Sequence, residues 1–337
     1  MEILRNQSLK QYNTFGIDAN SAYLVSIHNV DELKQILFGD IAKENPLLIL
    51  GGGSNILLTC DFNGLTILNR IIGIHVIDED DEHVYVKVGA GEVWHNFVLW
   101  CIDKNYAGVE NLSLIPGSVG AGPMQNIGAY GVELKEVFRE LEALEIASGE
   151  IHIFSKEKCR FGYRDSIFKR EAKGKYVITS VTFTLRKKAE FNTTYGAIET
   201  ELKAMGVTEL SIKAVSDAVC NIRRSKLPNP AEIGNAGSFF KNPEVSKEQY
   251  EAIKAKHADL VAYPTANGMK LAAGWLIEQS GLKGYRNGDA GVHTKQALVM
   301  VNYGGANGNE VYAIAKHVQQ SVKEKFGVEL EMEVNVL

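Results

Sequence analysis

The feature that most constrains this chain is a glycine triplet between two apolar runs, in the stretch PLLILGGGSNILL at residues 46–58. The run LLIL before the triplet predicts a short buried strand, and the residues after it predict strand and turn. Glycines at such a junction allow positive φ angles and let the backbone approach a phosphate closely. The stretch therefore predicts a strand–loop–strand unit whose backbone N–H groups form an anion nest, with an ordinary turn as the alternative.

Two common phosphate-binding motifs do not fit this stretch. A dinucleotide-binding loop needs a third glycine where this chain has Ile56, and a helix must follow it. A P-loop needs Gly-Lys-Ser/Thr after its spacer, and that sequence is absent here. A phosphate bound at residues 51–53 is therefore expected to contact loop backbone and not the N-terminus of a helix.

Apolar periodicity predicts an α+β class, with a strand-rich first part and a smaller mixed second part. Strand-like runs dominate residues 138–186, and a Pro/Gly/Asn-rich stretch near 228–243 is a plausible domain junction. The helix expected at about 92–104 has Val93, Phe97 and Trp100 on its apolar face. Further helices are expected at 30–45, 246–256, 268–280 and 311–327, and further strands at 83–91 and 330–337.

A second glycine-rich stretch, LIPGSVGAGPMQNIGAYG at residues 114–131, carries no charged side chain. A loop of this length is uncommon in a compact domain unless it has a function such as lining a ligand. Small residues allow its backbone to pack flat against a planar group, and Ser118, Gln125 and Asn126 can supply hydrogen bonds. The alternative is a buried crossover between strands.

Seven sequence blocks together resemble the UDP-N-acetylenolpyruvoylglucosamine reductase family, flavoproteins of peptidoglycan precursor synthesis. In chain order they are NTFGID, LILGGGSN, IPGSVGAGPMQNIGAYG, CRFGYRDSIFK, NAGSFFKNP, KLAAGWLIEQ and EVN, and they extend from about residue 13 to 333. The resemblance implies an FAD-binding region of the vanillyl-alcohol oxidase (PCMH) type at 1–190 and a linker at 191–218 that carries the tyrosine loop of type I enzymes. It also implies a C-terminal α+β substrate-binding domain at 219–337, whose last strand returns to the active site.

The resemblance assigns the cofactor, FAD, to both glycine-rich stretches. Because GGGSN contains no histidine, FAD is expected to be bound non-covalently. Gly122 departs from the family pattern, in which a Ser or Ala is expected, and this puts one hydrogen bond to FAD in doubt. The implied FAD-binding residues are Gly51, Gly52, Gly53, Ser54 and Asn55 around the pyrophosphate, and Ile115, Gly117, Ser118, Gly122, Asn126, Ile127 and Gly128 around the flavin.

The reaction implied by the resemblance is the NADPH-dependent reduction of an enolpyruvyl ether to a lactyl ether. Negative charge spreads into the substrate carboxylate, so the site needs a cationic group on that carboxylate and a proton donor. The resemblance assigns these roles to Arg164 and Ser238, with Glu333, carrying or sharing a proton, as the partner of Arg164. On residue type alone, a salt bridge from Arg164 to Asp165, a local hydrogen bond of Ser238 and a solvent-exposed Glu333 remain open.

The substrate, UDP-N-acetylglucosamine-enolpyruvate, carries two phosphates, whereas the chain has a net charge of −5 and a pI near 6.0. The segment NIRRSKLPNP supplies a local basic group of Arg223, Arg224 and Lys226, and the resemblance assigns the diphosphate to Lys226. It assigns further substrate contacts to Tyr130, Asn242, Gln296 and the type I tyrosine Tyr195.

Composition also limits other functions. The net negative charge provides no field that would gather nucleic acid, and no apolar run approaches the length of a membrane span. We therefore expect a cytoplasmic protein without nucleic-acid or membrane partners, and its histidines show no spacing typical of a metal site. Two alternative functions stay open, a related FAD-dependent alcohol or lactone oxidase and a non-catalytic nucleotide-sugar binder.

Overall fold

The computed structural model describes residues 1–195 and 197–337, and the chain forms two compact units. Since the chain crosses repeatedly from one unit to the other, each unit is discontinuous in sequence, and the crossing between Gly52 and Gly53 divides the glycine triplet. The division into functional regions 1–190, 191–218 and 219–337 remains a prediction. The first unit contains Met1–Gln7, Ser21–Gly52 and Asn63–Ser225, and the second contains Ser8–Asn20, Gly53–Phe62 and Lys226–Leu337.

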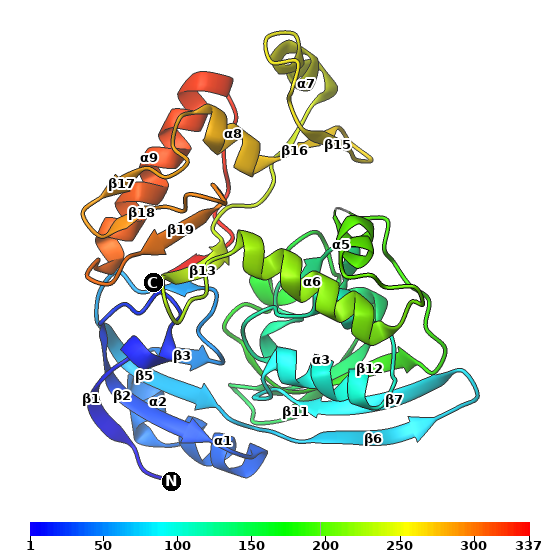
Figure 1. Ribbon diagram of the computed structural model, residues 1–337. Helices are drawn as coiled ribbons and strands as arrows, with labels where there is room; N and C mark the ends of the chain where they lie inside the picture. Colours follow the sequence, from blue (N-terminus) through cyan, green and yellow to red (C-terminus); the bar gives the residue numbers. More distant parts are fainter. Residues whose placement is uncertain (196) are drawn as a thin grey trace. The chain divides into compact units, whose positions relative to one another are not determined.

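The first unit contains a four-stranded sheet that leads directly into the glycine triplet (Figure 1). Its order is β1-β2-β5-β3, and β3 lies parallel to β5, with Leu50 beside Leu68 at the end of the ladder. Helix α1 packs Leu33, Ile36 and Leu37 into the core of this sheet. The elements are β1 Leu4–Ser8, β2 Asn20–Ile27, α1 Val30–Leu37, α2 Asp40–Glu44, β3 Leu47–Leu50 and β5 Phe62–Asn69.

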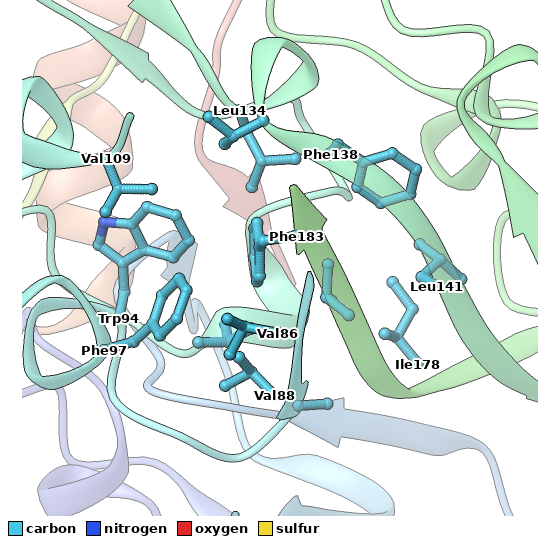
Figure 2. Packing of buried hydrophobic residues seen from close by; sticks show 14 of the residues in the cluster. Val86, Val88, Trp94, Phe97, Val109, Leu134, Phe138, Leu141, Ile178 and Phe183 are labelled. Carbon is cyan, nitrogen blue, oxygen red and sulfur yellow. The ribbon is translucent and has the colours of Figure 1, made fainter. Parts of the chain in front are cut away.

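A five-stranded antiparallel sheet of order β11-β10-β12-β7-β6 forms the larger core of the first unit. The alternation predicted for residues 83–91 is confirmed, because Val84, Val86 and Val88 of β7 are fully buried. Figure 2 shows aromatic rings packed over this face, with the Phe97 and Phe183 centroids 4.8 Å apart. The strands are β6 Ile74–Glu79, β7 His83–Gly89, β10 Phe138–Glu145, β11 Ile151–Ser155 and β12 Tyr176–Arg186.

Helix α3, Trp94–Asp103, covers this sheet, but its buried face differs from the predicted one. Phe97 is buried as predicted, whereas Val93 precedes the helix as its N-cap and is 50% exposed. Trp100 is only partly buried at the edge of the core. The helix starts later than predicted because residues 90–92 form a turn and Val93 makes an isolated bridge with Ser118 of the second glycine-rich stretch.

The remaining elements of the first unit are short, apart from α6, whose last residue, Lys226, lies beyond the unit. Helices α5 and α6 share a small apolar cluster that includes Ile198 and Val219, with Tyr130 packed against it. These elements are η2 Glu110–Leu112, η3 Val119–Ala121, β8 Gly128–Ala129, β9 Val132–Glu133, η4 Leu134–Glu136, α4 Lys156–Cys159, η5 Ile167–Lys169, α5 Ile198–Ala204 and α6 Ile212–Lys226.

The second unit is built on a sheet of order β13-β19-β18-β17 and on the parallel pair β20-β4. Helix α9 ends as predicted at Gly327, which has φ +66°, and it begins with a capping box between Asn307 and Glu310. The elements are η1 Lys10–Tyr12, β4 Ile56–Leu57, β13 Gly234–Ser238, β14 Glu244–Val245, α7 Lys247–Lys254, β15 Ala262–Pro264, β16 Met269–Leu271, α8 Ala273–Gln279, β17 Arg286–Asn287, β18 Ala290–Val292, β19 Val299–Asn302, α9 Gly308–Phe326 and β20 Asn335–Val336.

Two predictions for the second unit are wrong in extent. The helix expected at 268–280 is shorter, because residues 269–271 form strand β16 between β14 and β15. The strand expected at 330–337 is regular only at β20, with an isolated bridge between Met332 and Phe240. In the part of the chain described, no helix is long and apolar enough to cross a membrane.

Candidate active site

The two glycine-rich stretches meet backbone to backbone within the first unit. A Cβ added to Gly52 would lie 2.8 Å from the Cα of Gly117, and one added to Gly51 would overlap the hydroxyl of Ser118. Only glycine fits at such spacing unless neighbouring atoms move, which explains why positions 51 and 52 are glycines. The strand–loop–strand geometry predicted around the triplet is confirmed by β3 and β4 on either side of it.

Gly53 is held by a different part of the chain, within the second unit. Its φ is +60°, and an added Cβ would overlap the carbonyl oxygen of Tyr12. The Thr14 amide donates to the Gly53 carbonyl at 3.1 Å. Asn13 is buried and shapes this turn, since its side chain donates to the carbonyls of Leu9 and Ile17. The NTFGID block therefore supports the glycine triplet, a role that its sequence alone did not suggest.

The second glycine-rich stretch is fixed along its length by hydrogen bonds to neighbouring segments. The Trp94 amide donates to the Gly117 carbonyl at 3.0 Å, and the Gly120 amide donates to the Ala90 carbonyl at 2.9 Å. The Asn126 side chain is fully buried and bridges two segments, donating to the Gly162 carbonyl and accepting from the Lys135 amide. The amide group of Asn126 thus shapes the loop, whereas its predicted contact with FAD remains a prediction.

Packing also explains why position 122 is a glycine. A Cβ at this position would lie 2.6 Å from Cδ1 of Leu134 and 3.2 Å from the Val119 carbonyl oxygen. The departure from the expected Ser or Ala therefore matches the space next to Leu134. Ile115 and Ile127 pack as partly buried residues against the larger core.

Backbone strain gathers in this region of the first unit. Leu114, Asn126, Tyr130 and Arg164 all have left-handed φ angles, of +57°, +46°, +50° and +52°. Each such residue costs on the order of 1–3 kcal/mol and persists only where its surroundings enforce it. Strain of this kind concentrates at active sites and ligand clamps, and here it falls on the second glycine-rich stretch and on the turn that carries Arg164.

Arg164 stands in a tight turn closed by an isolated bridge between Gly162 and Asp165. Its Nη2 donates to the Gly128 carbonyl at 2.6 Å, so the guanidinium is tied to the glycine-rich stretch. The Asp165 carboxylate forms an ion pair with Arg170 at 3.1 Å.

Tyr130 and Tyr195 lie in the same part of the first unit. The Asn111 side chain donates to the carbonyls of Tyr130 and Asn192, which draws the end of the glycine-rich stretch toward the segment before Tyr195. A Cβ added to Gly131 would lie 3.1 Å from the Cβ of Tyr195. Tyr195 itself is 49% exposed, and the next residue of the predicted tyrosine loop, Gly196, lies outside the described residues.

Sequence reasoning placed Arg223 only in a basic group, yet the structure gives it a distinct environment. Its Nε donates to the Leu114 carbonyl at 3.2 Å, and the Leu114 amide donates to Nδ1 of His95 at 3.0 Å. Burial lowers the pKa of Arg223, and the positive charge of Arg164 lowers it as well, while Tyr130 and Cys220 act in the opposite direction. Helical periodicity gives no signal for Arg223, because Val219 and Cys220, which precede Arg223 and Arg224 by four residues, are both buried.

In the second unit, the end of the glycine triplet loop is bound to the C-terminal segment. The Asn55 side chain donates to the Glu333 carbonyl at 3.2 Å, and the Asn335 amide donates to the Asn55 carbonyl at 3.1 Å. The Glu333 amide donates in turn to the carbonyl of Phe239, the residue after Ser238. The structure therefore brings Asn55, Ser238 and Glu333 onto neighbouring backbone segments.

Asn242 and Gln296 meet at the start of α8 in the second unit. Oδ1 of Asn242 accepts from the Ala273 amide at 2.9 Å, and a Cβ added to Gly274 would lie 3.2 Å from Oε1 of Gln296. Their side-chain oxygens therefore help to organise the unit around α8. Lys226, the last residue of α6, is exposed.

The predicted residues that the structure brings together form two groups in the first unit and one group, of Asn55, Ser238 and Glu333, in the second. In the first unit, the structure brings together Gly51, Gly52, Gly117 and Ser118, and separately Arg164, Gly128 and Tyr130. Loop backbone without side chains, as at Gly51, Gly52 and Gly117, forms a cradle that a phosphate-bearing cofactor can approach closely, so the residues present fit FAD.

The fold and this cradle define the class, an FAD-binding flavoprotein. The sequence profile of the FAD binding domain matches residues 21–155, and the profile of the UDP-N-acetylenolpyruvoylglucosamine reductase C-terminal domain matches residues 229–337. The predicted fold class, an α+β chain with an FAD-binding domain and a separate C-terminal domain, is thereby confirmed.

Relatives then identify the family. A UDP-N-acetylenolpyruvoylglucosamine reductase of Pseudomonas putida is 52% identical over 330 residues, covering 98% of this chain and 97% of the relative. One of Amoebophilus asiaticus is 53% identical over 338 residues, covering all of both chains. The crystal structure of the Thermus caldophilus reductase covers 99% of this chain and 98% of its own, at a TM-score of 0.69 and 23% identity, and it supports the fold alone. The chain belongs to the UDP-N-acetylenolpyruvoylglucosamine reductase family.

Proposed function

We propose that this chain reduces UDP-N-acetylglucosamine-enolpyruvate to UDP-N-acetylmuramate, using NADPH and FAD, in peptidoglycan precursor synthesis. The observation that carries the proposal is the identity of 52% and 53% with enzymes of this name over essentially the whole chain. FAD, when bound, supplies the hydride chemistry that links NADPH to the substrate. The chain is an FAD-dependent oxidoreductase, and the roles of its individual residues are proposed below.

The cradle of Gly51, Gly52 and Gly117 would hold FAD through backbone contacts. Because these glycines already touch backbone to backbone, their N–H groups are organised before the cofactor binds. Successive backbone N–H groups in a turn stabilise phosphate oxygens. Asn55, fixed to the C-terminal segment, ends the same loop. No covalent link is needed in this arrangement, so we propose that FAD is bound non-covalently.

Arg164 is proposed to bind the substrate carboxylate. Its guanidinium stays charged at any working pH and offers a planar pair of donors that matches a carboxylate. The hydrogen bond to the Gly128 carbonyl and the strained φ of +52° fix the position from which this side chain extends. Since negative charge on the carboxylate grows during the reduction, a fixed cation there stabilises the transition state more than the ground state.

Ser238 is proposed to donate a proton to the substrate carbon, and Glu333 to carry or share a proton near the developing charge. Both belong to the second unit, and the amide of Glu333 donates to the carbonyl that follows Ser238. Strand β13, paired with β19, gives Ser238 a rigid support, with Ser238 opposite Val299 in the register. A serine hydroxyl is a weak acid, so its work as a proton donor requires a neighbouring group or water to share the proton.

The proposal also covers the residues that contact the substrate and the cellular compartment in which the enzyme acts. Lys226, Asn242, Gln296, Tyr130 and Tyr195 are proposed to contact the nucleotide-sugar, with Lys226 on the diphosphate and Tyr195 on the type I loop. NADPH and UDP-activated sugars are cytosolic metabolites, so we expect the enzyme to act in the cytoplasm. We propose no nucleic-acid partner.

Replacing Ser238 with Ala tests this assignment by separating the two halves of the reaction. NADPH should still bleach the visible flavin absorbance at nearly the wild-type rate. Recovery of that absorbance on anaerobic addition of the enolpyruvyl substrate should slow by about 10²–10³-fold, the typical effect of losing one transition-state donor. Equal loss of both steps would assign Ser238 the wrong role.

The wild-type protein provides the test of the function itself. Its bleached absorbance should recover with UDP-N-acetylglucosamine-enolpyruvate in the absence of oxygen. Fast recovery with oxygen alone, and none with the sugar nucleotide, would instead indicate an oxidase.

A further inference from the structure

Arg223 is a half-buried cation of the first unit, and the family assignment leaves its role open. Within residues 1–195 and 197–337, no carboxylate is among the groups that act on its charge. A desolvated guanidinium without a counter-ion is unfavourable, because the charge loses its hydration and gains no ion pair in return. A structural arginine would be expected to have such a partner.

The Arg223 side chain is also held in a defined direction. Its Nε donates to the carbonyl of Leu114, a residue with a strained φ of +57°. The amide of Leu114 is held at its other side by Nδ1 of His95. Because the Nε–H is used by this carbonyl, the terminal Nη groups form the part of the fork that can meet a ligand.

Arg164 and Arg223 approach the same stretch of chain from different elements. Arg223 holds Leu114 at its beginning and Arg164 holds Gly128 near its end. Asn111 closes this stretch by donating to the Tyr130 carbonyl, and the ring of Tyr130 packs on the α6 cluster that contains Ile222. Both guanidinium groups are therefore tied to one glycine-rich stretch, and in agreement the positive charge of Arg164 lowers the pKa of Arg223.

We propose that Arg223 is a second guanidinium for the carboxylate of the enolpyruvyl group, acting together with Arg164. This inference rests on the proposed function. Two like charges brought together repel, and a shared anion between them converts this repulsion into attraction. A carboxylate whose charge grows during the reaction can accept paired hydrogen bonds from each guanidinium, one on each oxygen edge.

A binding comparison with oxidised, FAD-loaded enzyme tests this role without relying on turnover. UDP-N-acetylmuramate contains the lactyl carboxylate, whereas UDP-N-acetylglucosamine has the same nucleotide and diphosphate without it. In Arg223→Gln, titration calorimetry should show a loss of about 10- to 100-fold in affinity for UDP-N-acetylmuramate, as expected for hydrogen bonds to a charged group. Affinity for UDP-N-acetylglucosamine should stay within about twofold of wild type.

Two further variants separate binding from structure. Arg224→Gln removes the same charge from the next, exposed position of α6. In this variant, the ratio of the affinity for UDP-N-acetylmuramate to that for UDP-N-acetylglucosamine should not change. Arg223→Lys keeps the charge but loses the planar fork, so the ratio should fall between those of wild type and Arg223→Gln. FAD content and the unfolding temperature of each variant report whether the first unit is intact.

Each outcome decides the matter. Equal weakening of both ligands in Arg223→Gln would overturn the proposal and assign Arg223 to the diphosphate or to structure. Unchanged binding of both ligands would overturn it as well. If wild-type enzyme reduces the enolpyruvyl substrate while the ratio is unchanged in Arg223→Gln, only this inference fails. If wild-type enzyme does not reduce that substrate, the proposed function fails first.

Discussion

Replacing Gly52 with Ala tests the contact on which the FAD cradle depends. The added Cβ would lie 2.8 Å from the Gly117 Cα, 3.2 Å from its carbonyl carbon and 3.5 Å from the Ser118 amide nitrogen. Carbon atoms pack best at about 3.5–4.0 Å, so the two glycine-rich segments must separate by roughly 1 Å. All three neighbours are backbone atoms, and they cannot rotate away as a side chain can. Overpacking of this kind costs about 1–3 kcal/mol.

If FAD binds only when the segments touch, this strain appears in the affinity for the cofactor. The dissociation constant of FAD should rise by a factor of about 5–150, since 1.4 kcal/mol corresponds to tenfold. The assay is titration of the apoprotein with FAD, followed by flavin fluorescence, together with thermal unfolding of the apo and FAD-loaded forms.

Gly51→Ala is the matched control, because its added methyl meets the hydroxyl of Ser118, which can rotate. Its FAD affinity should lie between those of wild type and Gly52→Ala. A Gly52→Ala protein that binds FAD as tightly as wild type, with an unchanged unfolding temperature, would refute the reasoning. Equal losses in the two alanine variants would also refute it, because backbone and side-chain obstacles would then not differ.

Two predictions concern pH and stability. Burial lowers the pKa of His95 below its usual 6.5, and the charges of Arg224 and Arg223 lower it further. The free energy of unfolding should therefore fall as pH drops below about 6.5. His95→Gln keeps an acceptor for the Leu114 amide and should remove that part of the fall, measured by urea unfolding between about pH 5 and 7. Burial raises the pKa of Glu110 above 4.5, although the Gly108 amide donates a hydrogen bond to its carboxylate. Ionisation of Glu110 should therefore lower the free energy of unfolding as pH rises above about 4.5. Glu110→Gln should reduce that loss, and an unchanged pH profile of the unfolding free energy would contradict the assignment.

Local patterns in the sequence predicted much of the fold. The alternation of Val84, Val86 and Val88 and the helical spacing that ends at Gly327 depend on one element and its buried face, and both were confirmed. Periodicity did not separate β16 from α8, because the pairing of residues 269–271 with β14 and β15 is a contact between distant segments. Such pairing overrides local propensity, and one sequence carries no direct signal of it.

In the candidate site, too, local features could be predicted from the sequence, whereas contacts between distant segments could not. The sequence was sufficient to select two uncharged glycine-rich stretches as ligand loops. It did not show that Gly52 and Gly117, which are far apart in the chain, are in contact. Asn13 was part of a recognisable block, yet its role in shaping the turn that holds Gly53 required the hydrogen bonds. Arg223 lies in an evidently basic segment, and only the three-dimensional packing distinguishes it from the exposed Arg224.

Two features of the first unit oppose folding of the unliganded protein. These are the strained backbone at Leu114 and Arg164 and the charge of Arg223 kept near that of Arg164. An apolar side chain of similar volume at position 223 would remove the repulsion between the two positive charges. Retaining two guanidinium groups around one glycine-rich stretch makes physical sense if an anion binds there, because the repulsion then decreases upon binding and the donors need little rearrangement. The same preorganisation favours a substrate whose negative charge increases as it reacts.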